Sequence, residues 1–340
     1  MILCLYPKGF VEPRPSCFVQ KFIYCWLICP IMSSTNSFSS PGLTGSPPAR
    51  DSQTFTLSSG DILGYAEYGL DTAPPIFYCH GCPGSRLEAE LWAGVVVAAG
   101  VRLIGVDRPG IGLSSFRAGR KFSDWPETLV ELAQHLDIHE FSILAHSGGA
   151  PYALVCAKAL PSSQLRKVTI ACGRGPPWLG TRRMAFSGKL LMFMYTWLPF
   201  TMRRVFDWML LGAARDPDPN VFKQMMLKGL EAMSEPDRLC LKDDKLATAL
   251  VESVRESAKQ GSEGIAYDAR LLGSWDLTIE DIDFGVKLWC GEEDTNCPSE
   301  MSREIAQRLR HGELKVVPGE GHVSLPLNYG EEMLRELSAM

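Results

Sequence analysis

Short apolar runs alternate with helix-like stretches along the chain from residue 53 onward. The runs at 75–79 and 101–106 are typical of strands that are buried on both faces of a sheet. The helix-like stretch 87–99 separates them, and 124–136 carries apolar residues at helical spacing, with Pro126 near its start. The same rhythm continues through apolar runs at 141–145 and 167–171 and a helical stretch at 148–160. Strands that alternate with helices predict an α/β fold with a mainly parallel central sheet wrapped by helices.

A long segment without clear strands interrupts this rhythm. Residues 176–280 contain 8 of the 13 methionines and show no strand pattern. Beyond them the alternation resumes with an apolar run, a helix, a second apolar run and a last helix, at 286–290, 298–310, 314–317 and 329–339. We therefore predict one α/β core, 53–175 and 281–340, with residues 176–280 inserted as a helical lid. The core opens with a hairpin whose strands, 54–57 and 62–66, flank the turn residues Ser59, Gly60 and Asp61.

Residues 1–52 lack the alternation of strands and helices and are predicted to form a disordered or targeting segment. Residues 22–32 are apolar and follow three basic residues, as in the core of a short signal peptide. These eleven residues are too few to span a bilayer as a helix, which takes about 20. A membrane-anchored form and a true start at Met32 stay open as alternatives. Residues 33–52 are rich in Ser, Pro and Gly and are predicted to be disordered.

The composition is that of a soluble protein with a buried core, at 46% hydrophobic and 21% charged residues. The net charge of −5 gives no basic footprint for nucleic acid, which is excluded as a partner. The 11 cysteines lack the spacing of a disulfide framework, and the chain has no N-glycosylation sequon. These features favour a reducing, cytoplasmic location. Cys79 and Cys82 match a C-x-x-C redox motif, although a catalytic loop explains this segment better.

The segment ILAHSGG, residues 143–149, comes close to a nucleophile elbow. A strand-like run leads into Ser147, and the G-x-S-x-G pattern fails only because Ala145 replaces its first glycine. The elbow needs small residues two before and two after the serine, and Ala145 and Gly149 are both small. The backbone N–H of Gly148, at the start of the next helix, would stabilise an oxyanion. The alternative is that Ser147 is an ordinary helix N-cap.

The loop HGCPGS, residues 80–85, directly follows an early apolar strand. In a hydrolase the second oxyanion N–H comes from a loop at this place, so Cys82 would donate through its backbone while its thiol is incidental. The alternative is an ordinary Gly/Pro turn.

An acid and a histidine follow two later strands. Glu292, Glu293 and Asp294 come directly after one of them, and Asp294 is preferred because it lies deepest in the turn. Such an acid orients a histidine and stabilises its charged form. His322 follows the last predicted strand, and the order Ser147, Asp294, His322 is the chain order of a hydrolase triad.

Taken together, residues 53–340 resemble the α/β-hydrolase family, in its branch with a helical lid and an HGxPG-type oxyanion loop. The motifs that carry the resemblance are HGCPGS at 80–85, VDRPGIGLSS at 106–115, AHSGGA at 145–150, LWCGEEDTNCP at 288–298 and PGEGH at 318–322. The resemblance implies that Ser147 is the nucleophile, His322 the general base and Asp294 its partner. It implies an oxyanion hole at Cys82 and Gly148, and no cofactor. The serine disfavours epoxide hydrolases and haloalkane dehalogenases, whose nucleophile is an aspartate.

Residues 190–200 form an apolar and aromatic run that is broken only by Thr196 and is predicted to pack as a lid helix. Met192 and Trp197 are expected to line the substrate pocket as well, together with His80 and His146 in the catalytic loops. Five bases and no acids lie between residues 175 and 206. This pattern is compatible with an anionic substrate or a membrane surface, but we favour a solvated face over membrane contact.

The sequence thus predicts a serine hydrolase that cleaves a carboxylic ester or related acyl bond of an apolar small molecule. Thioesterases and carbon–carbon-bond hydrolases share this triad and stay open as alternatives. A non-hydrolytic ligand-binding protein or cyclase on the same fold also stays open. No metal is predicted, because His135 and His139 straddle an apparent helix end. The oligomeric state is left open.

Overall fold

The computed structural model describes residues 50–179, 181–216, 218–230 and 232–339. The predictions made for residues 1–49 therefore lie outside the described residues. The first strand, β1 (Arg50–Thr56), begins three residues before the predicted start of the core at residue 53. It does so because Arg50 pairs opposite Glu67 of β2 (Ile62–Gly69), which extends the hairpin beyond its apolar part.

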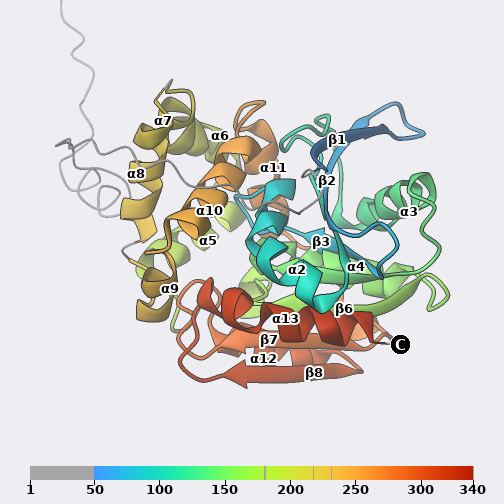
Figure 1. Ribbon diagram of the computed structural model, residues 1–340. Coiled ribbons are helices and arrows are strands. Elements are labelled where there is room, and N and C mark those ends of the chain that lie inside the picture. The colour runs from blue at the N-terminus through green and yellow to red at the C-terminus, as the bar shows by residue number, and fades with distance from the viewer. Residues whose placement is uncertain (1–49, 180, 217, 231, 340) are drawn as a thin grey trace, which may run out of the picture.

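Eight strands form a single sheet in the order β1-β2-β4-β3-β5-β6-β7-β8 (Figure 1). The β1–β2 and β2–β4 pairs are antiparallel, and every other neighbouring pair is parallel. The other strands are β3 (Pro75–Cys79), β4 (Arg102–Val106), β5 (Phe141–His146), β6 (Leu165–Ala171), β7 (Val286–Gly291) and β8 (Gly312–Val317). The prediction of a mainly parallel sheet is confirmed. The predicted β1–β2 hairpin is also confirmed, and Gly60 in its turn has a φ of +86°, which glycine adopts without strain.

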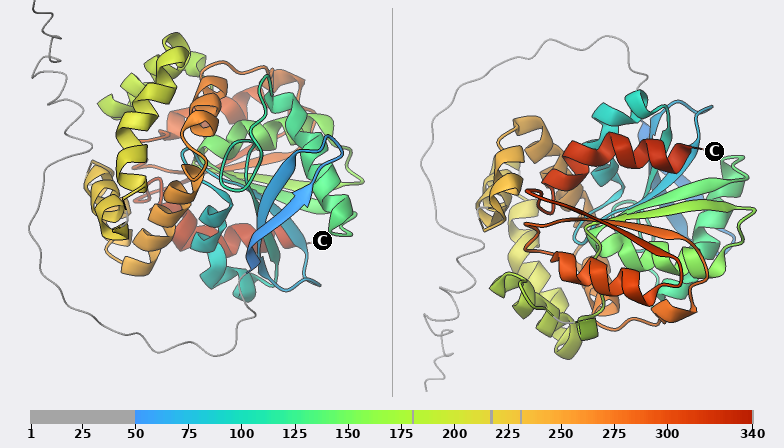
Figure 2. Two further views of the ribbon diagram at one scale, coloured as in Figure 1. Left: turned by 90° about the horizontal axis from the view of Figure 1, so that it is seen from above. Right: turned by 90° about the horizontal axis from the view of Figure 1, so that it is seen from below.

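Helices cover both faces of this sheet (Figure 2), which is why its central strands β4 and β5 are buried at every position. In β3, Ile76 and Tyr78 enter one hydrophobic core, whereas Phe77 and Cys79 enter another on the opposite face. The first core is closed by α2 (Ala93–Ala99) and α13 (Ser324–Ser338). The second is closed by α3 (Trp125–His135), α4 (Ala150–Ala159) and α12 (Ser299–Arg308).

Two predicted helices differ from those observed. The stretch 87–99 is a 3-10 helix, η1 (Arg86–Trp92), that continues into α2. The last helix, α13, begins at Ser324 rather than near residue 329. Pro326 lies in its first turn, where the missing N–H removes no helical hydrogen bond.

Between β6 and β7 the described residues form helices and no strand. These are α5 (Phe186–Trp197), α6 (Met202–Phe206), α7 (Gly212–Ala214), α8 (Pro219–Leu230), α9 (Glu235–Cys240), α10 (Asp244–Ser257) and α11 (Glu263–Leu272). Figure 1 shows them gathered to one side of the sheet, beyond the carboxyl ends of its parallel strands. In the part of the chain that the structure describes, no helix has the length and apolarity needed to cross a membrane.

Candidate active site

Ser147 lies on a sharp turn between a strand and a helix. It directly follows β5, and its φ of +51° lies in the left-handed region that non-glycine residues rarely adopt. The chain then passes through a short 3-10 turn, η3 (Ser147–Gly149), into α4. A Cβ atom at Gly149 would overlap the carbonyl oxygen of Cys79, so the turn passes too close to β3 for a larger residue. This strained, closely packed turn has the geometry of a nucleophile elbow.

The side chain of Ser147 does not cap a helix. The N-cap residues of η3 and α4 are His146 and Gly149, and neither helix start has a side-chain capping bond. The hydroxyl of Ser147 instead lies 3.9 Å from the thiol of Cys297, which is a weak partner. The hydroxyl is therefore available for chemistry, which disfavours the N-cap alternative.

The acid and the histidine expected near Ser147 are paired with each other. Nδ1 of His322 lies 2.8 Å from Oδ2 of Asp294, and both side chains are buried. The second oxygen of Asp294 accepts the backbone N–H groups of Asn296 and Cys297, each at 2.8 Å. With Nδ1 bonded to a carboxylate, Nε2 of the imidazole is the nitrogen that can accept a proton. Among the three acids of this loop, only Asp294 is buried, since its two neighbours are exposed.

Ser147 and His322 line one cavity of about 210 Å³. The loops at the strand ends form its floor, including Gly81 and Cys82. Helices of the 176–280 segment supply its apolar walls, formed by Leu191, Tyr195, Phe206, Met209, Leu210, Met225, Met226, Met233, Leu250 and Val254. The cavity therefore brings the predicted nucleophile and base together under a largely apolar cover.

The loop at 80–85 holds the backbone of Cys82 beside Gly148. A Cβ atom built on Gly148 would lie 3.1 Å from the backbone nitrogen of Cys82. Arg108 fixes the loop by donating to the carbonyl oxygens of His80 and Gly81, at 2.6 and 2.8 Å. Among the described residues the Cys82 N–H has no hydrogen-bond acceptor. The backbone nitrogen of Cys82 thus lies beside Gly148, the residue that follows Ser147.

A buried carboxylate that the sequence did not single out supports this loop. Oε1 of Glu88, in η1, accepts the Tyr78 hydroxyl at 2.7 Å and the Gly81 N–H at 2.9 Å, and lies 3.0 Å from Nδ1 of His146. Burial alone would raise the pKa of Glu88, but the hydrogen bond and charge of His146 outweigh it and lower that pKa to about 2. Burial would likewise lower the pKa of His146, yet Glu88 raises it. The other nitrogen of His146 lies 3.1 Å from the His322 carbonyl, so the Glu88–His146 pair connects the loop at 80–85 with the loop that carries His322.

A second missed residue, Asp237, comes from α9 of the inserted segment and holds the His322 loop. Oδ2 accepts the backbone N–H of His322 at 3.0 Å, and Oδ1 accepts those of Val323 and Ser324 at 2.7 and 3.0 Å. Ser234 donates its hydroxyl to the same carboxylate at 2.7 Å. The inserted helices therefore position the histidine as well as cover the cavity.

Arg174 is a third residue that sequence reasoning missed. It follows β6, donates its backbone N–H to the Ser147 carbonyl at 2.9 Å, and lines the cavity. Its Nη1 atom is buried without a hydrogen-bond partner among the described residues. Sequence offered no signal for it, because one arginine after a strand has no distinguishing pattern.

Three side chains beside the cavity lie close enough to be considered as metal ligands. The ligand atoms of Cys172, Asp294 and His322 lie within 4.8 Å of one another. Asp294 and His322 are already bonded to each other. Burial raises the pKa of the Cys172 thiol well above its usual value, and this disfavours the thiolate form that binds metals. The donor set fits a hydrogen-bonded acid–histidine pair better than a metal site.

Of the four residues expected in the substrate pocket, only His146 lines the cavity. His80 is fully buried beneath the loop, where its Nδ1 donates to the Gly81 carbonyl at 2.8 Å. Met192 is buried in a small cluster of methionines away from the cavity, and Trp197 is 70% exposed. The predictions for Met192 and Trp197 were wrong, because α5 turns Leu191 and Tyr195 toward the cavity. Successive side chains on a helix point about 100° apart, so residues one or two positions further along face other directions.

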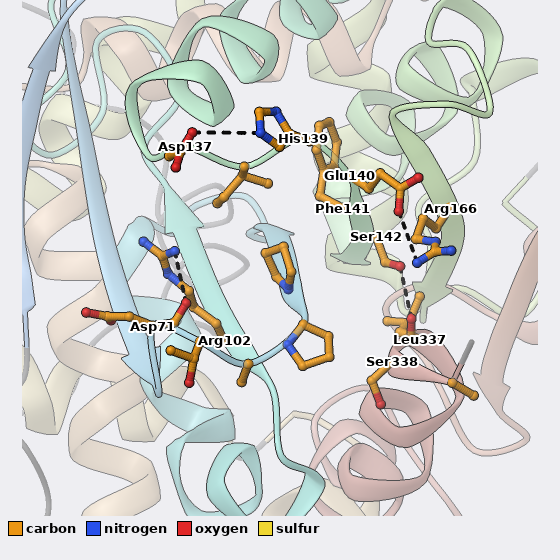
Figure 3. Close-up of a pocket in the computed structure, with 16 residues that line it drawn as sticks. Asp71, Arg102, Asp137, His139, Glu140, Phe141, Ser142, Arg166, Leu337 and Ser338 are labelled. Carbon is orange, nitrogen blue, oxygen red and sulfur yellow. Dashed lines mark hydrogen bonds and ion pairs between the residues drawn. The ribbon is translucent and has the colours of Figure 1, made fainter.

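A second hollow lies at the opposite ends of the strands and is distinct from the cavity that Ser147 and His322 line (Figure 3). It opens where β3, β4 and β5 begin, and four of its charged or titratable groups form two pairs. His139 lies 3.8 Å from Asp137, and Arg166 lies 3.1 Å from Glu140. In parallel α/β sheets ligands bind at the carboxyl ends of the strands, which is where Ser147 and His322 are found.

Comparisons with known proteins agree with the fold described above. A family model described as the alpha/beta hydrolase family matches residues 76–336. A thermophilic esterase from Thermogutta terrifontis is 18% identical with a TM-score of 0.58, covering 86% of this chain and 98% of that chain. An esterase from Exiguobacterium antarcticum is 19% identical with a TM-score of 0.59, covering 84% and 97%. The enol-lactonase from Burkholderia xenovorans LB400 is 16% identical with a TM-score of 0.58, also covering 84% and 97%.

A comparison with curated protein sequences gives no match. The family match spans more than half of the chain, and the solved structures share its fold over nearly their whole length. The chain belongs to the alpha/beta hydrolase family of enzymes.

Proposed function

We propose that the protein is a serine hydrolase that cleaves a carboxylic ester, or a related acyl bond, of a small apolar molecule. The observation that carries the proposal is that Ser147, on its strained turn, shares one apolar cavity with the paired His322 and Asp294. The similar structures include two esterases and an enol-lactonase, and these names favour an ester as the bond that is broken.

In the first half of the reaction the Ser147 hydroxyl attacks the ester carbonyl carbon while Nε2 of His322 takes the hydroxyl proton. Asp294 holds the imidazole through Nδ1 and stabilises the imidazolium that forms. The negative charge that develops on the carbonyl oxygen is held by the N–H groups of Cys82 and Gly148. The bond to the alcohol then breaks, and His322 returns its proton to the departing alkoxide, which leaves an acyl-enzyme.

In the second half a water molecule attacks the acyl carbon and gives its proton to His322. The bond to Ser147 Oγ breaks, the serine regains its proton from His322, and the carboxylic acid leaves. Both halves use the same two N–H groups, because an oxyanion forms at the same place each time. Apart from the substrate and this water molecule, the proposed reaction uses only side chains and backbone groups of this chain.

The size of the cavity limits the substrate. Its volume of about 210 Å³ lies below the ~300–1,000 Å³ that is common for pockets of drug-sized ligands. We propose that the helices of residues 176–280 act as a lid over it and that short acyl groups fit without rearrangement. Longer acyl chains would require these helices to part.

The test is hydrolysis of p-nitrophenyl esters whose acyl groups run from acetate to decanoate. We expect turnover that is highest for the short acyl groups and a loss of about 10⁴-fold or more in Ser147→Ala. Ser338→Ala, at the far end of α13, is the matched control and should hydrolyse the esters at the wild-type rate. β-Diketones are assayed in parallel. Cleavage of a β-diketone with inert esters, or no reaction by folded wild-type protein, would overturn the ester proposal.

A further inference from the structure

Helix α5 carries an apolar stripe that faces away from the protein. Its inner side, at Leu191 and Tyr195, lines the catalytic cavity. Leu190, Phe193 and Trp197 are 40%, 53% and 70% exposed. They follow one another at intervals of three and four residues, which places them on one side of the helix. A helix in a globular protein normally turns such a stripe to the core, so the outward stripe needs an explanation.

The stripe belongs to a larger apolar surface. Seven of the fourteen large hydrophobic side chains that are exposed in the described part of the chain lie between residues 178 and 200. We call them the α5 outer surface: Trp178, Phe186, Leu190, Phe193, Trp197, Leu198 and Phe200. Trp178, Phe193 and Trp197 line one shallow hollow together with Lys189, so this part of the surface is continuous. Single exposed apolar residues are common, but a concentration of this kind marks a site of interaction.

Basic residues lie in the same stretch of the chain as the α5 outer surface, and Lys189 lines the hollow within it. Five bases and no acids lie between residues 175 and 206, in a chain whose net charge is −5. Arg183 pairs with Glu300 at 3.1 Å, and Arg203 lies 3.6 Å from Glu263. The other three, Arg182, Lys189 and Arg204, make no ion pair with any described residue. The surface is thus both apolar and positive, and it complements a partner that is apolar and negative.

The sequence alone favoured a solvated face here, but the exposed apolar side chains change that interpretation. We propose that the α5 outer surface docks on an anionic lipid membrane. Exposed Trp and Phe rings beside Lys and Arg are typical of segments that lie in the boundary between lipid headgroups and acyl chains. The acidic remainder of the chain orients this one surface toward a negatively charged bilayer. Docking would place against the lipid a helix whose other side lines the cavity, so apolar molecules dissolved in the membrane would reach it directly. Binding does not require Ser147, and the proposal therefore goes beyond the hydrolase activity and stands apart from it.

Cosedimentation of the full chain with lipid vesicles tests the proposal. We expect binding to vesicles of phosphatidylcholine with phosphatidylserine, and binding at least about tenfold weaker to phosphatidylcholine alone or at high salt. The double variant Phe193→Ser/Trp197→Ser should bind the anionic vesicles at least about tenfold more weakly. The double variant Arg182→Glu/Lys189→Glu should lose a similar factor or more, because each base near the surface contributes about fivefold.

Matched controls separate this surface from the rest of the chain. Val97→Ser on α2 removes an apolar side chain that is 66% exposed, and Lys242→Glu reverses an exposed charge elsewhere. Both should bind as the wild type does, and so should Ser147→Ala even though it is inactive. The proposal is overturned if the wild type ignores anionic vesicles, or if both double variants bind them unchanged, since binding would then belong to another part of the chain. It is also overturned if the apolar variant only converts a dimer to a monomer in size-exclusion chromatography without weakening vesicle binding.

Discussion

Replacing Asp237 with asparagine is expected to slow catalysis from outside the cavity. The carboxylate of Asp237 accepts the backbone N–H groups of His322, Val323 and Ser324, and so fixes the loop that carries the base. Asparagine has the same shape but a single acceptor oxygen. If that oxygen keeps the bonds to Val323 and Ser324, the amide nitrogen must face the His322 N–H, and two donors then oppose each other.

The size of the effect follows from these contacts. A hydrogen bond to a charged acceptor contributes about 1.5–3 kcal/mol, and a buried donor left without a partner costs about 1–3 kcal/mol. We therefore expect the free energy of unfolding to fall by about 2–4 kcal/mol in Asp237→Asn. If about 1.4–2.7 kcal/mol of this loss also raises the activation free energy, because His322 is held less well in the transition state, kcat/KM falls by about 10- to 100-fold.

The assay compares kcat/KM for p-nitrophenyl acetate at a temperature where circular dichroism shows the variant to be folded. Asp243→Asn is the matched control, because this exposed aspartate of the same segment caps α10 by accepting the N–H groups of Lys245 and Leu246 at 2.8 and 3.3 Å. It should lower stability slightly and leave kcat/KM within about twofold. A folded Asp237→Asn protein with wild-type kcat/KM would refute the positioning role, as would an equal loss in the control.

Three further outcomes are expected. Gly149→Ala should give little folded protein, because the added Cβ overlaps a carbonyl oxygen of β3. In Gly94→Ala, on α2, the added Cβ has nothing within 4 Å, so the melting temperature should equal or exceed that of the wild type. Burial and the nearby arginine charge lower the pKa of His80 to about 3 from its ordinary 6.5, so only the unfolded chain takes up this proton as the pH falls below 6.5. Urea unfolding at about pH 7 and pH 4.5 should therefore show the free energy of unfolding of the wild type falling by about 2.5 kcal/mol more than that of His80→Gln. Equal losses in the two proteins would contradict this. Asp294→Asn should lower kcat/KM by about 10³-fold or more and Glu292→Gln by less than about twofold. The reverse ranking would assign the role of the acid to Glu292.

Local sequence was sufficient for the features that depend on neighbouring residues. The apolar runs predicted strands buried on both faces, because a sheet covered by helices on both faces buries its central strands. The small residues around Ser147 predicted a tight turn, since the approach of β5, α4 and β3 leaves no space for larger ones. The acid was ambiguous among three neighbours in sequence, and burial of Asp294 distinguishes it from the exposed Glu292 and Glu293.

Sequence failed where contacts join distant segments or where periodicity was lost. Asp237 bonds to a loop 85 residues away, and Glu88 lies 58 residues from His146, so neither pairing leaves a local pattern. Met192 and Trp197 were misplaced because residues 190–200 are apolar almost throughout. Such a run does not reveal which side of a helix faces inward.

That Ser147 is the nucleophile is tested most directly by mapping the site of a fluorophosphonate adduct. The native protein is treated with the probe, digested, and its peptides are analysed by mass spectrometry. One adduct is expected, on Ser147, and it should be absent from Ser147→Ala and from protein that was unfolded before treatment. An adduct on another residue, or a folded wild-type protein that takes up no probe, would contradict the proposed chemistry.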